Sequence, residues 1–211
     1  PMEVVSVNLG DNVSFPWNGE THTTGIFKNP VDNPIHLGKE GVVDDVIANP
    51  KVHGGIFKAC YLFSTNHYPY WKEKYPHLKW LWGMFGENIT VEGLDEANLR
   101  IGDVYELGEA LVQITQPREP CYKLGYRFEN QGILKEFIDH GYPGTYVRVI
   151  EEGMVKVGDR ITLRKKSDST LTVKAFYELL YARQKSKTLL ELAIANTALP
   201  EKKREKLKKY L

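Results

Sequence analysis

The sequence contains little cysteine and no long apolar run. Two cysteines, Cys60 and Cys121, stand among 211 residues, and no Cys-x-x-Cys spacing occurs. Two thiols are too few for a disulfide framework, and a structural zinc site is not expected, so we predict free thiols in a reducing cytoplasm. No apolar stretch approaches the roughly 20 residues that cross a bilayer. The first residues also lack a basic segment followed by an apolar one, so neither a membrane segment nor a secretory signal is expected.

The charge is unevenly distributed along the chain. The 42% hydrophobic and 26% charged residues are typical of a soluble globular protein, and the net charge is only +1. Residues 167–211 nevertheless hold 10 Lys and Arg against 5 Asp and Glu, whereas residues 1–166 hold 18 against 22. This difference indicates two modules, and the acidic balance of the longer one argues against nucleic acid as its partner.

Residues 1–166 show the pattern of an all-β barrel or sandwich, since short β-branched and aromatic runs alternate with Gly, Asp, Asn and Pro. Gly108 is predicted to open a two-residue hairpin loop. One helix is expected within residues 67–81, where the spacing of Tyr68, Trp71 and Tyr75 indicates core packing. The expected strands are 3–9, 23–28, 55–64, 88–93, 104–108, 110–116, 145–153 and 159–165.

Residues 167–211 change to helical periodicity. We predict a first helix capped by Ser169 or Thr170, a second within 188–198, and a third that opens at Pro200. Each helix is short, so the three must pack on one another or on the barrel. The third is basic, and a solvated face explains this better than a nucleic-acid or acidic protein partner does.

Two glycine-containing stretches have residues suited to chemistry. His53 precedes Gly54 and Gly55, whose backbone N–H groups can approach an anion closely, and Lys58 follows; a plain turn explains this stretch equally well.

In the second stretch, Gly83 and Gly86 precede Glu87 and Asn88. This carboxylate and amide can orient a polar ligand or move a proton. A turn into the strand at Ile89 explains the stretch nearly as well.

The stretch QPREPCYKLGYRF, residues 116–128, is more informative. Pro117 and Pro120 favour an extended backbone that presents Arg118 and Cys121 at a strand end. The cations of Arg118, Lys123 and Arg127 favour a thiolate, which is either a nucleophile or a soft-metal ligand. Cys60, within an apolar run, is instead interpreted as a small buried hydrophobe.

Taken in order, these motifs resemble the MOSC domain, the family of molybdenum cofactor sulfurase C-terminal-like β-barrels, in its YiiM-like branch. The matching text comprises TGIFKNPV, VHGGIFKAC, FGENITVEGLDEANLRIGD, QPREPCYKL and GYPGTYVRVIEEGMVKVGDRITL, which together span nearly all of residues 2–166. The tail from Leu171 resembles the three-helix domain that follows the barrel in this branch. The resemblance implies a MOSC β-barrel domain over 1–166 and a C-terminal three-helix domain over 167–211.

The resemblance also implies a function, which is the reduction of N-hydroxylated bases such as hydroxylaminopurine to the amine. The molybdenum cofactor, a molybdopterin, would lie in an open groove, with Cys121 as thiolate ligand of the metal. Electrons would come from a separate reductase, and proteins of cofactor biosynthesis or insertion are further partners. His53 and Glu87 join Cys121 as candidate catalytic residues. The candidate cofactor-binding residues are His53, Gly54, Gly55, Lys58, Asn88, Arg118, Cys121, Arg127 and Arg148.

A second function remains open. A carrier that holds molybdopterin or a persulfide on Cys121 without turnover needs the same exposed thiolate among cations. A nucleic-acid-binding module with a basic tail ranks below both, because residues 1–166 are net acidic.

Overall fold

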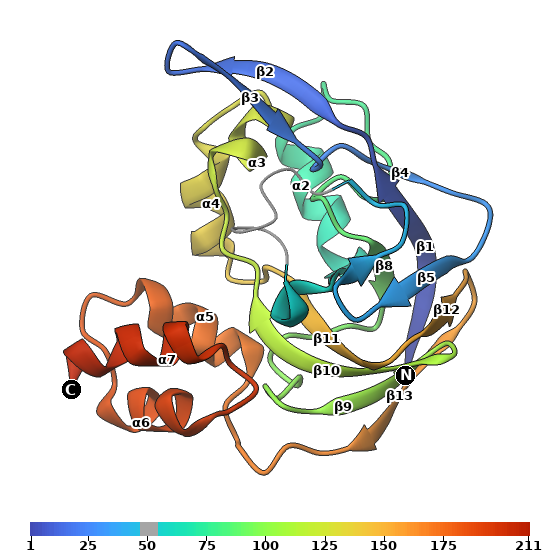
Figure 1. Cartoon of the computed structure of the whole chain (residues 1–211). Helices are drawn as coiled ribbons and strands as arrows, with labels where there is room; N and C mark the ends of the chain where they lie inside the picture. Colours follow the sequence, from blue (N-terminus) through green and yellow to red (C-terminus); the bar gives the residue numbers. More distant parts are fainter. Residues whose placement is uncertain (47–54) are drawn as a thin grey trace.

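The computed structural model describes residues 1–46 and 55–211, and a closed β-barrel lies at its centre (Figure 1). Seven strands follow the order β13-β9-β10-β11-β7-β8-β1, and β1 pairs back onto β13 to close the ring. Neighbours are antiparallel except for β7 and β8, which are parallel. The predicted β-barrel is thus confirmed. Its strands are β1 (Met2–Gly10), β7 (Cys60–Ser64), β8 (Ile89–Glu92), β9 (Val104–Leu107), β10 (Ala110–Pro117), β11 (Thr145–Glu151) and β13 (Arg160–Lys165).

Alternation along the strands builds the barrel core. On β10, Val112 and Ile114 are buried, and they lie beside Val147 and Val149 of β11. Each such side chain stabilises the fold by about 1.5 to 3 kcal/mol on burial. The predicted hairpin is confirmed, because β9 and β10 are joined by two residues that begin with Gly108 at φ 56°.

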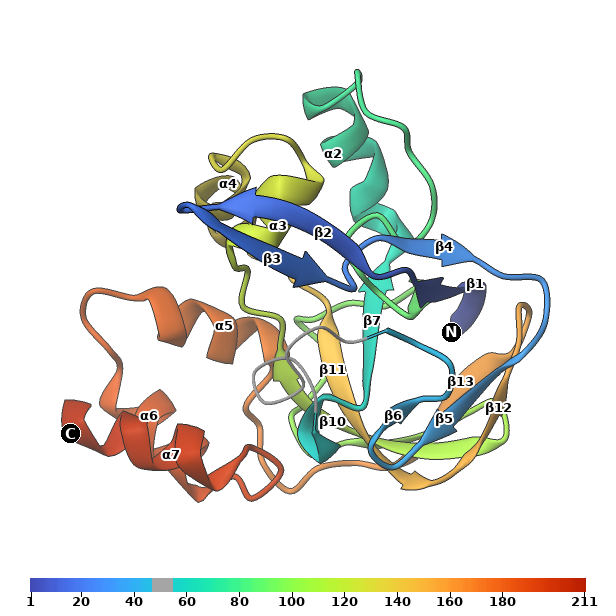
Figure 2. The ribbon, with the colours of Figure 1, turned by 45° about the horizontal axis from the view of Figure 1, so that its top comes forward.

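Smaller sheets extend the barrel. Strand β4 (Lys28–Pro30) pairs with the outer end of β1. The hairpin of β2 (Val13–Trp17) and β3 (Glu20–Thr24) projects across α3 (Figure 2), where Phe15 stacks on Tyr126. A third sheet combines β5 (Ile35–Gly38), β6 (Gly41–Val42) and β12 (Gly153–Val155).

Two expected strands are wrong. Residues 23–28 do not form one strand, because the chain leaves β3 at Thr24 and turns, with Lys28 Nζ donating back to the carbonyl oxygen of Gly25 at 3.0 Å. The strand expected over 55–64 begins only at Cys60, since Gly55 has φ 94° and leads into the 3-10 helix η1 (Ile56–Lys58).

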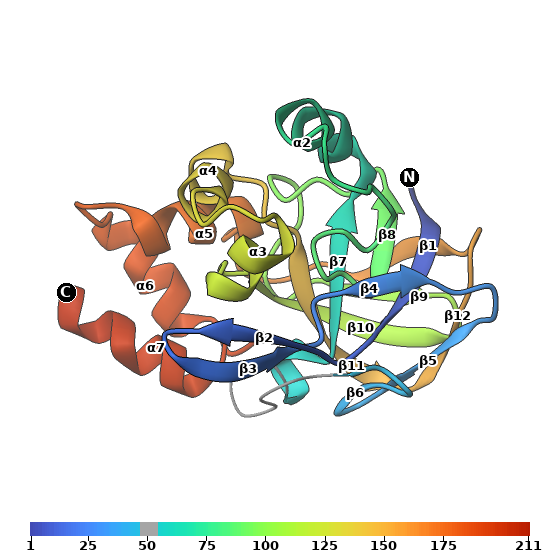
Figure 3. The same ribbon diagram turned by 90° about the horizontal axis from the view of Figure 1, so that it is seen from above.

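The barrel region also contains more helices than the single one expected. The helix α2 (Tyr68–Lys74) forms as predicted after the 3-10 helix η2 (Thr65–His67), and Trp71 is fully buried. Two more helices, α3 (Tyr122–Arg127) and α4 (Ile133–His140), stand beside the barrel (Figure 3). The signal for α4 was present, because Ile133 and Phe137 form its apolar face and Gly141 ends it at φ 83°.

Three C-terminal helices follow β13, as predicted: α5 (Val173–Tyr181), α6 (Lys187–Ala195) and α7 (Glu201–Leu207), with the 3-10 helix η3 (Lys208–Tyr210) at the end. The predicted cap of the first is wrong, since the Thr172 hydroxyl accepts the hydrogen bond from Ala175 N. Phe176, Leu190 and Leu207 belong to the same hydrophobic cluster as the barrel residue Val112. None of the helices in the described part of the chain is long and apolar enough to cross a membrane.

A buried carboxylate joins these layers. Glu96 is fully buried, and its Oε2 accepts a hydrogen bond of 2.8 Å from Gly144 N, just before β11. Its backbone oxygen accepts from Lys174 N in α5. Burial raises the pKa of Glu96 to about 7, and the negative charge of Asp95 adds to this, while the Gly144 N–H and the Lys174 ammonium oppose it.

The fold should therefore lose stability as pH rises through the Glu96 transition. The carboxyl titrates near pH 7 in the folded state and near its ordinary pKa of 4.5 when unfolded, so the folded protein binds more protons between these values. We expect Glu96→Gln to match wild type near pH 4.5 and to exceed its free energy of unfolding by about 1 to 3 kcal/mol at pH 8. Urea titrations at both pH values measure this, with the exposed Glu92→Gln as control. An equal difference at both pH values would contradict the assignment.

Candidate functional site

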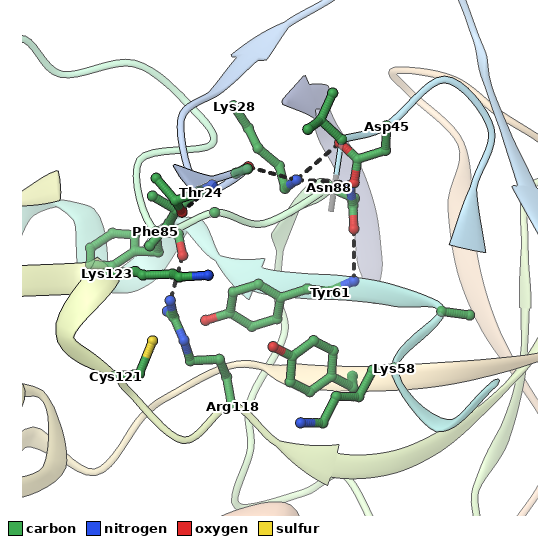
Figure 4. A pocket seen from close by; sticks show the side chains of 16 residues that line it. Thr24, Lys28, Asp45, Lys58, Tyr61, Phe85, Asn88, Arg118, Cys121 and Lys123 are labelled. Carbon is green, nitrogen blue, oxygen red and sulfur yellow. Dashed lines mark hydrogen bonds and ion pairs between the residues drawn. The ribbon is translucent and has the colours of Figure 1, made fainter. Parts of the chain in front are cut away.

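A pocket lies where the FGEN loop (residues 83–88), the PREPC loop (residues 117–121) and the start of β7 meet, and Cys121 lines it (Figure 4). We call it the Cys121 pocket. Side chains from six separate parts of the chain reach it, so no single motif forms it. Its polar and aromatic lining consists of Thr24, Lys28, Asp45, Lys58, Tyr61, Phe85, Asn88, Arg118, Cys121, Lys123 and Tyr146.

The PREPC loop presents Cys121 as its sequence predicts. Strand β10 ends at Pro117, and Cys121 has extended backbone angles (φ −130°, ψ 175°) directly before α3. Between them, the buried Arg118 donates from Nη1 to the Phe85 carbonyl oxygen at 3.0 Å. Its guanidinium also lies over the rings of Tyr61 and Phe137, at 5.4 and 5.7 Å from their centroids. Arg118 thus ties the PREPC loop to the FGEN loop.

The FGEN loop is organised by the Tyr68 hydroxyl. This oxygen accepts from Gly83 N and Met84 N at 3.1 and 3.2 Å and donates to Glu87 Oε2 at 2.5 Å. The other oxygen of Glu87 accepts from Phe85 N at 3.1 Å. Burial raises the pKa of Glu87, against the opposing effect of these donors. The carboxyl group of Glu87 is therefore engaged in shaping the loop.

The opposite wall contains a paired charge. Lys28 Nζ lies 3.0 Å from both carboxylate oxygens of Asp45, and both side chains are almost fully buried. Asp45 also accepts from Gly10 N and from Asn88 Nδ2, each at 2.8 Å. Asn88 Oδ1 in turn accepts from Tyr61 N at 3.1 Å. This network holds β1, β7 and the FGEN loop together around the pocket.

Two further cations on the walls, Arg118 and Lys123, have no such carboxylate partner among the described residues. Figure 4 shows Lys58, Arg118 and Lys123 directed into the pocket. Arg118 and Lys123 are both buried, and neither joins an ion pair among the described residues. Burial lowers the pKa of Lys58, and the positive charges of Lys203 and Arg118 lower it further. Buried cations without a carboxylate partner are costly in a protein interior, so the pocket is suited to an anion.

The two cysteines differ as expected. Cys121 is half-buried in the pocket wall, within reach of a ligand. Cys60 is fully buried in the barrel core, and this burial raises the pKa of its thiol. The interpretation of Cys60 as a small buried hydrophobe is confirmed.

The structure brings together Lys58, Asn88, Arg118 and Cys121 of the predicted site residues. It places Gly55, Glu87, Arg127 and Arg148 elsewhere. Gly55 is exposed next to η1, and Glu87, although part of the FGEN loop, is fully buried and does not line the pocket. His53 and Gly54 lie outside the described residues.

Two predicted cations are also placed away from the pocket. Arg127 lies over the ring of Phe27, 4.6 Å from its centroid, at a separate surface hollow beside α3. Arg148 of β11 donates to Gln113 Oε1 of β10 at 3.0 Å. The sequence alone could not distinguish these two arginines from Arg118, because whether a side chain enters the pocket depends on its direction from the helix or strand. In the fold, Arg127 and Arg148 point away from the pocket.

The sequence did not indicate Lys28, Asp45, Tyr61 or Tyr146 as site residues. Tyr61 follows Cys60 on β7, and successive side chains of a strand face opposite sides of the sheet. With Cys60 interpreted as a core residue, this alternation could have placed Tyr61 outside the barrel core. Lys123 lies two residues after Cys121, and the sequence identified it as a cation near the thiol but not as a site residue. Asp45 and Lys28 are far apart in sequence, and only the fold unites them.

These features define a class of protein: closed β-barrels with a thiol in a cation-rich pocket. The family model of the MOSC domain matches residues 49–162. The chain belongs to the MOSC family.

Known relatives agree with this assignment. YflK of Bacillus subtilis (strain 168) is 36% identical over 198 residues, which cover 94% of this chain and 89% of that protein. The crystal structure of YiiM from Geobacillus stearothermophilus superimposes with a TM-score of 0.83 at 31% identity, covering both chains completely. A protein of Gibberella moniliformis named reductase is 33% identical over 171 residues, which cover 80% of this chain but only 30% of that longer protein.

The Lys28 and Asp45 pair should be important for stability. Asp45→Asn removes the negative charge while leaving Lys28 buried, and we expect the free energy of unfolding at pH 7 to fall by about 3 to 5 kcal/mol. Asp44→Asn is the matched control, because Asp44 is exposed and its φ of 66° is tolerated by Asn. Urea denaturation measures both. Equal stability of the two variants would show that the pair contributes little.

Proposed function

We propose that the chain is a molybdenum-cofactor-dependent oxidoreductase that reduces N-hydroxylated bases or related compounds to amines. The observation that supports this most is the presence of one accessible thiol, Cys121, in a pocket with the buried cations Arg118 and Lys123. Membership of the MOSC family supports a role related to the molybdenum cofactor. The relative named reductase supports redox chemistry.

The residues of the pocket fit such a cofactor. Molybdopterin has a phosphate group and a dithiolene, and molybdenum held by sulfur prefers a thiolate as protein ligand. Cys121 would provide that thiolate. Arg118 and Lys123 would hold the phosphate, with Lys58 at the edge, and Asn88 would contact polar atoms of the pterin. When bound, the cofactor supplies two-electron redox chemistry at the metal.

The reaction needs electrons and protons from two sources. Reduction of R–NHOH with two electrons and two protons gives R–NH₂ and water. The electrons would come from a separate reductase, after cofactor insertion by biosynthetic proteins in the cytoplasm. Lys58 is a candidate proton donor at the pocket, because burial lowers its pKa. His53 remains a second candidate on the basis of the family resemblance, and Glu87 is better assigned to positioning the FGEN loop.

The alternative function is a carrier that holds the cofactor or sulfur on Cys121 without turning over a substrate. It uses the same thiol and the same cations. The two functions differ in one result: a reductase converts hydroxylaminopurine with an artificial electron donor, whereas a carrier only exchanges cofactor.

The test uses protein expressed in a host that makes molybdopterin. We expect wild type to contain molybdenum and pterin and to reduce hydroxylaminopurine, and Cys121→Ser to lose at least about 100-fold of this rate because the metal loses a ligand. Bound cofactor should also protect Cys121 from alkylation by iodoacetamide, a readout independent of turnover. The core residue Cys60 should stay unlabelled throughout. Full activity of Cys121→Ser would contradict the ligand assignment, and cofactor without turnover would favour the carrier.

A further inference from the structure

The last helix of the chain reaches the loop that carries Cys121. Lys203 of α7 forms an ion pair with Glu119, which stands between Arg118 and Pro120 in the PREPC loop. The Lys203 side chain is only 20% exposed. Figure 1 shows α5 and α7 beside the end of β10 from which this loop leaves. The C-terminal helices are therefore in direct contact with the segment that presents the thiol.

This ion pair lies close to the pocket. The pKa of Lys58, which burial lowers most, is lowered further by the charge of Lys203 and raised by that of Glu119. The pair is thus within electrostatic range of a pocket side chain, although neither Lys203 nor Glu119 lines the pocket.

Glu119 has the wrong charge for an anion-binding site. It is adjacent in sequence to Arg118 and two residues from Cys121. An unmatched carboxylate here would repel an anionic ligand and would compete with it for the pocket cations. The same difficulty at Asp45 is resolved by Lys28. Lys203 pairs with Glu119 in the same sense, although Glu119 is 42% exposed whereas Asp45 is 3% exposed. Arg118 and Lys123 stay without a carboxylate partner among the described residues.

We propose that Lys203 is a positioning residue that neutralises Glu119, so that the C-terminal helices set the affinity of the Cys121 pocket for its anionic ligand. This inference rests on the proposed function, since it takes the ligand to be the phosphate-bearing cofactor. It assigns a role inside the protein to one lysine of the basic last helix. The exposed lysines of α7 are not needed for it.

A double-mutant cycle on cofactor-free, full-length protein tests this proposal. Binding of inorganic phosphate is measured by isothermal titration at low ionic strength, and pterin retained after expression in a cofactor-producing host is a second readout. We expect Lys203→Ala to weaken phosphate binding by about three- to tenfold, as one uncompensated charge near the site implies. Glu119→Gln should bind at least as tightly as wild type, and Lys203→Ala combined with Glu119→Gln should return to the wild-type affinity. Lys202→Ala, on the exposed side of α7, is the matched control and should have no effect.

The alternatives give different results. Unchanged affinity in Lys203→Ala would overturn the proposal, and so would a loss that persists in the double variant, which would indicate direct contact or a structural role. If Lys203→Ala does not fold, Glu119→Gln decides alone, because weaker phosphate binding in that variant contradicts neutralisation.

Lys123→Met separates this inference from the proposed function. If Lys123→Met weakens binding and Lys203→Ala does not, only the inference fails. If wild type binds neither phosphate nor pterin, both fail.

Discussion

The buried guanidinium of Arg118 is the constraint on which the site depends. It is held by the Phe85 carbonyl oxygen and by the faces of Tyr61 and Phe137, with no carboxylate partner among the described residues. A charge removed from water in this way requires compensation from dipoles, aromatic faces or a ligand anion. The same contacts join the PREPC loop to the FGEN loop. Arg118 therefore helps to place the thiol and also contributes positive charge to the pocket, together with Lys58 and Lys123.

The surrounding networks make this arrangement rigid. The Tyr68 hydroxyl fixes the FGEN loop by three hydrogen bonds, which in turn fixes the oxygen that receives Arg118. Asp45 holds the opposite wall through Gly10, Lys28 and Asn88. Fully satisfied polar networks of this kind specify one geometry and have little freedom to relax. The pocket is thus largely formed before any ligand binds, which reduces the ordering cost of binding.

Much of this could be predicted from the sequence, but not the parts that depend on long-range contacts. The barrel followed from alternating runs, and Cys121 from two prolines and neighbouring cations, because these signals are local. Arg127 and Arg148 were assigned to the pocket because of their charge and motif, and the fold turns them toward Phe27 and Gln113. The ion pair of Lys28 with Asp45 depends on a turn after β3. The sequence did not predict this turn, because the apolar residues within 23–28 indicated a continuous strand. Local pattern thus located the thiol, while tertiary contacts decided which cations surround it.

The role proposed for Cys121 is that of a protein ligand of molybdenum in a cation-lined pocket. Molybdenum X-ray absorption on protein purified from a cofactor-producing host tests it most directly, by comparing wild type with Cys121→Ser. The account predicts that the metal in wild type has one more sulfur neighbour than the metal in the variant. Identical sulfur coordination in the two proteins, or no molybdenum in wild type, would contradict it.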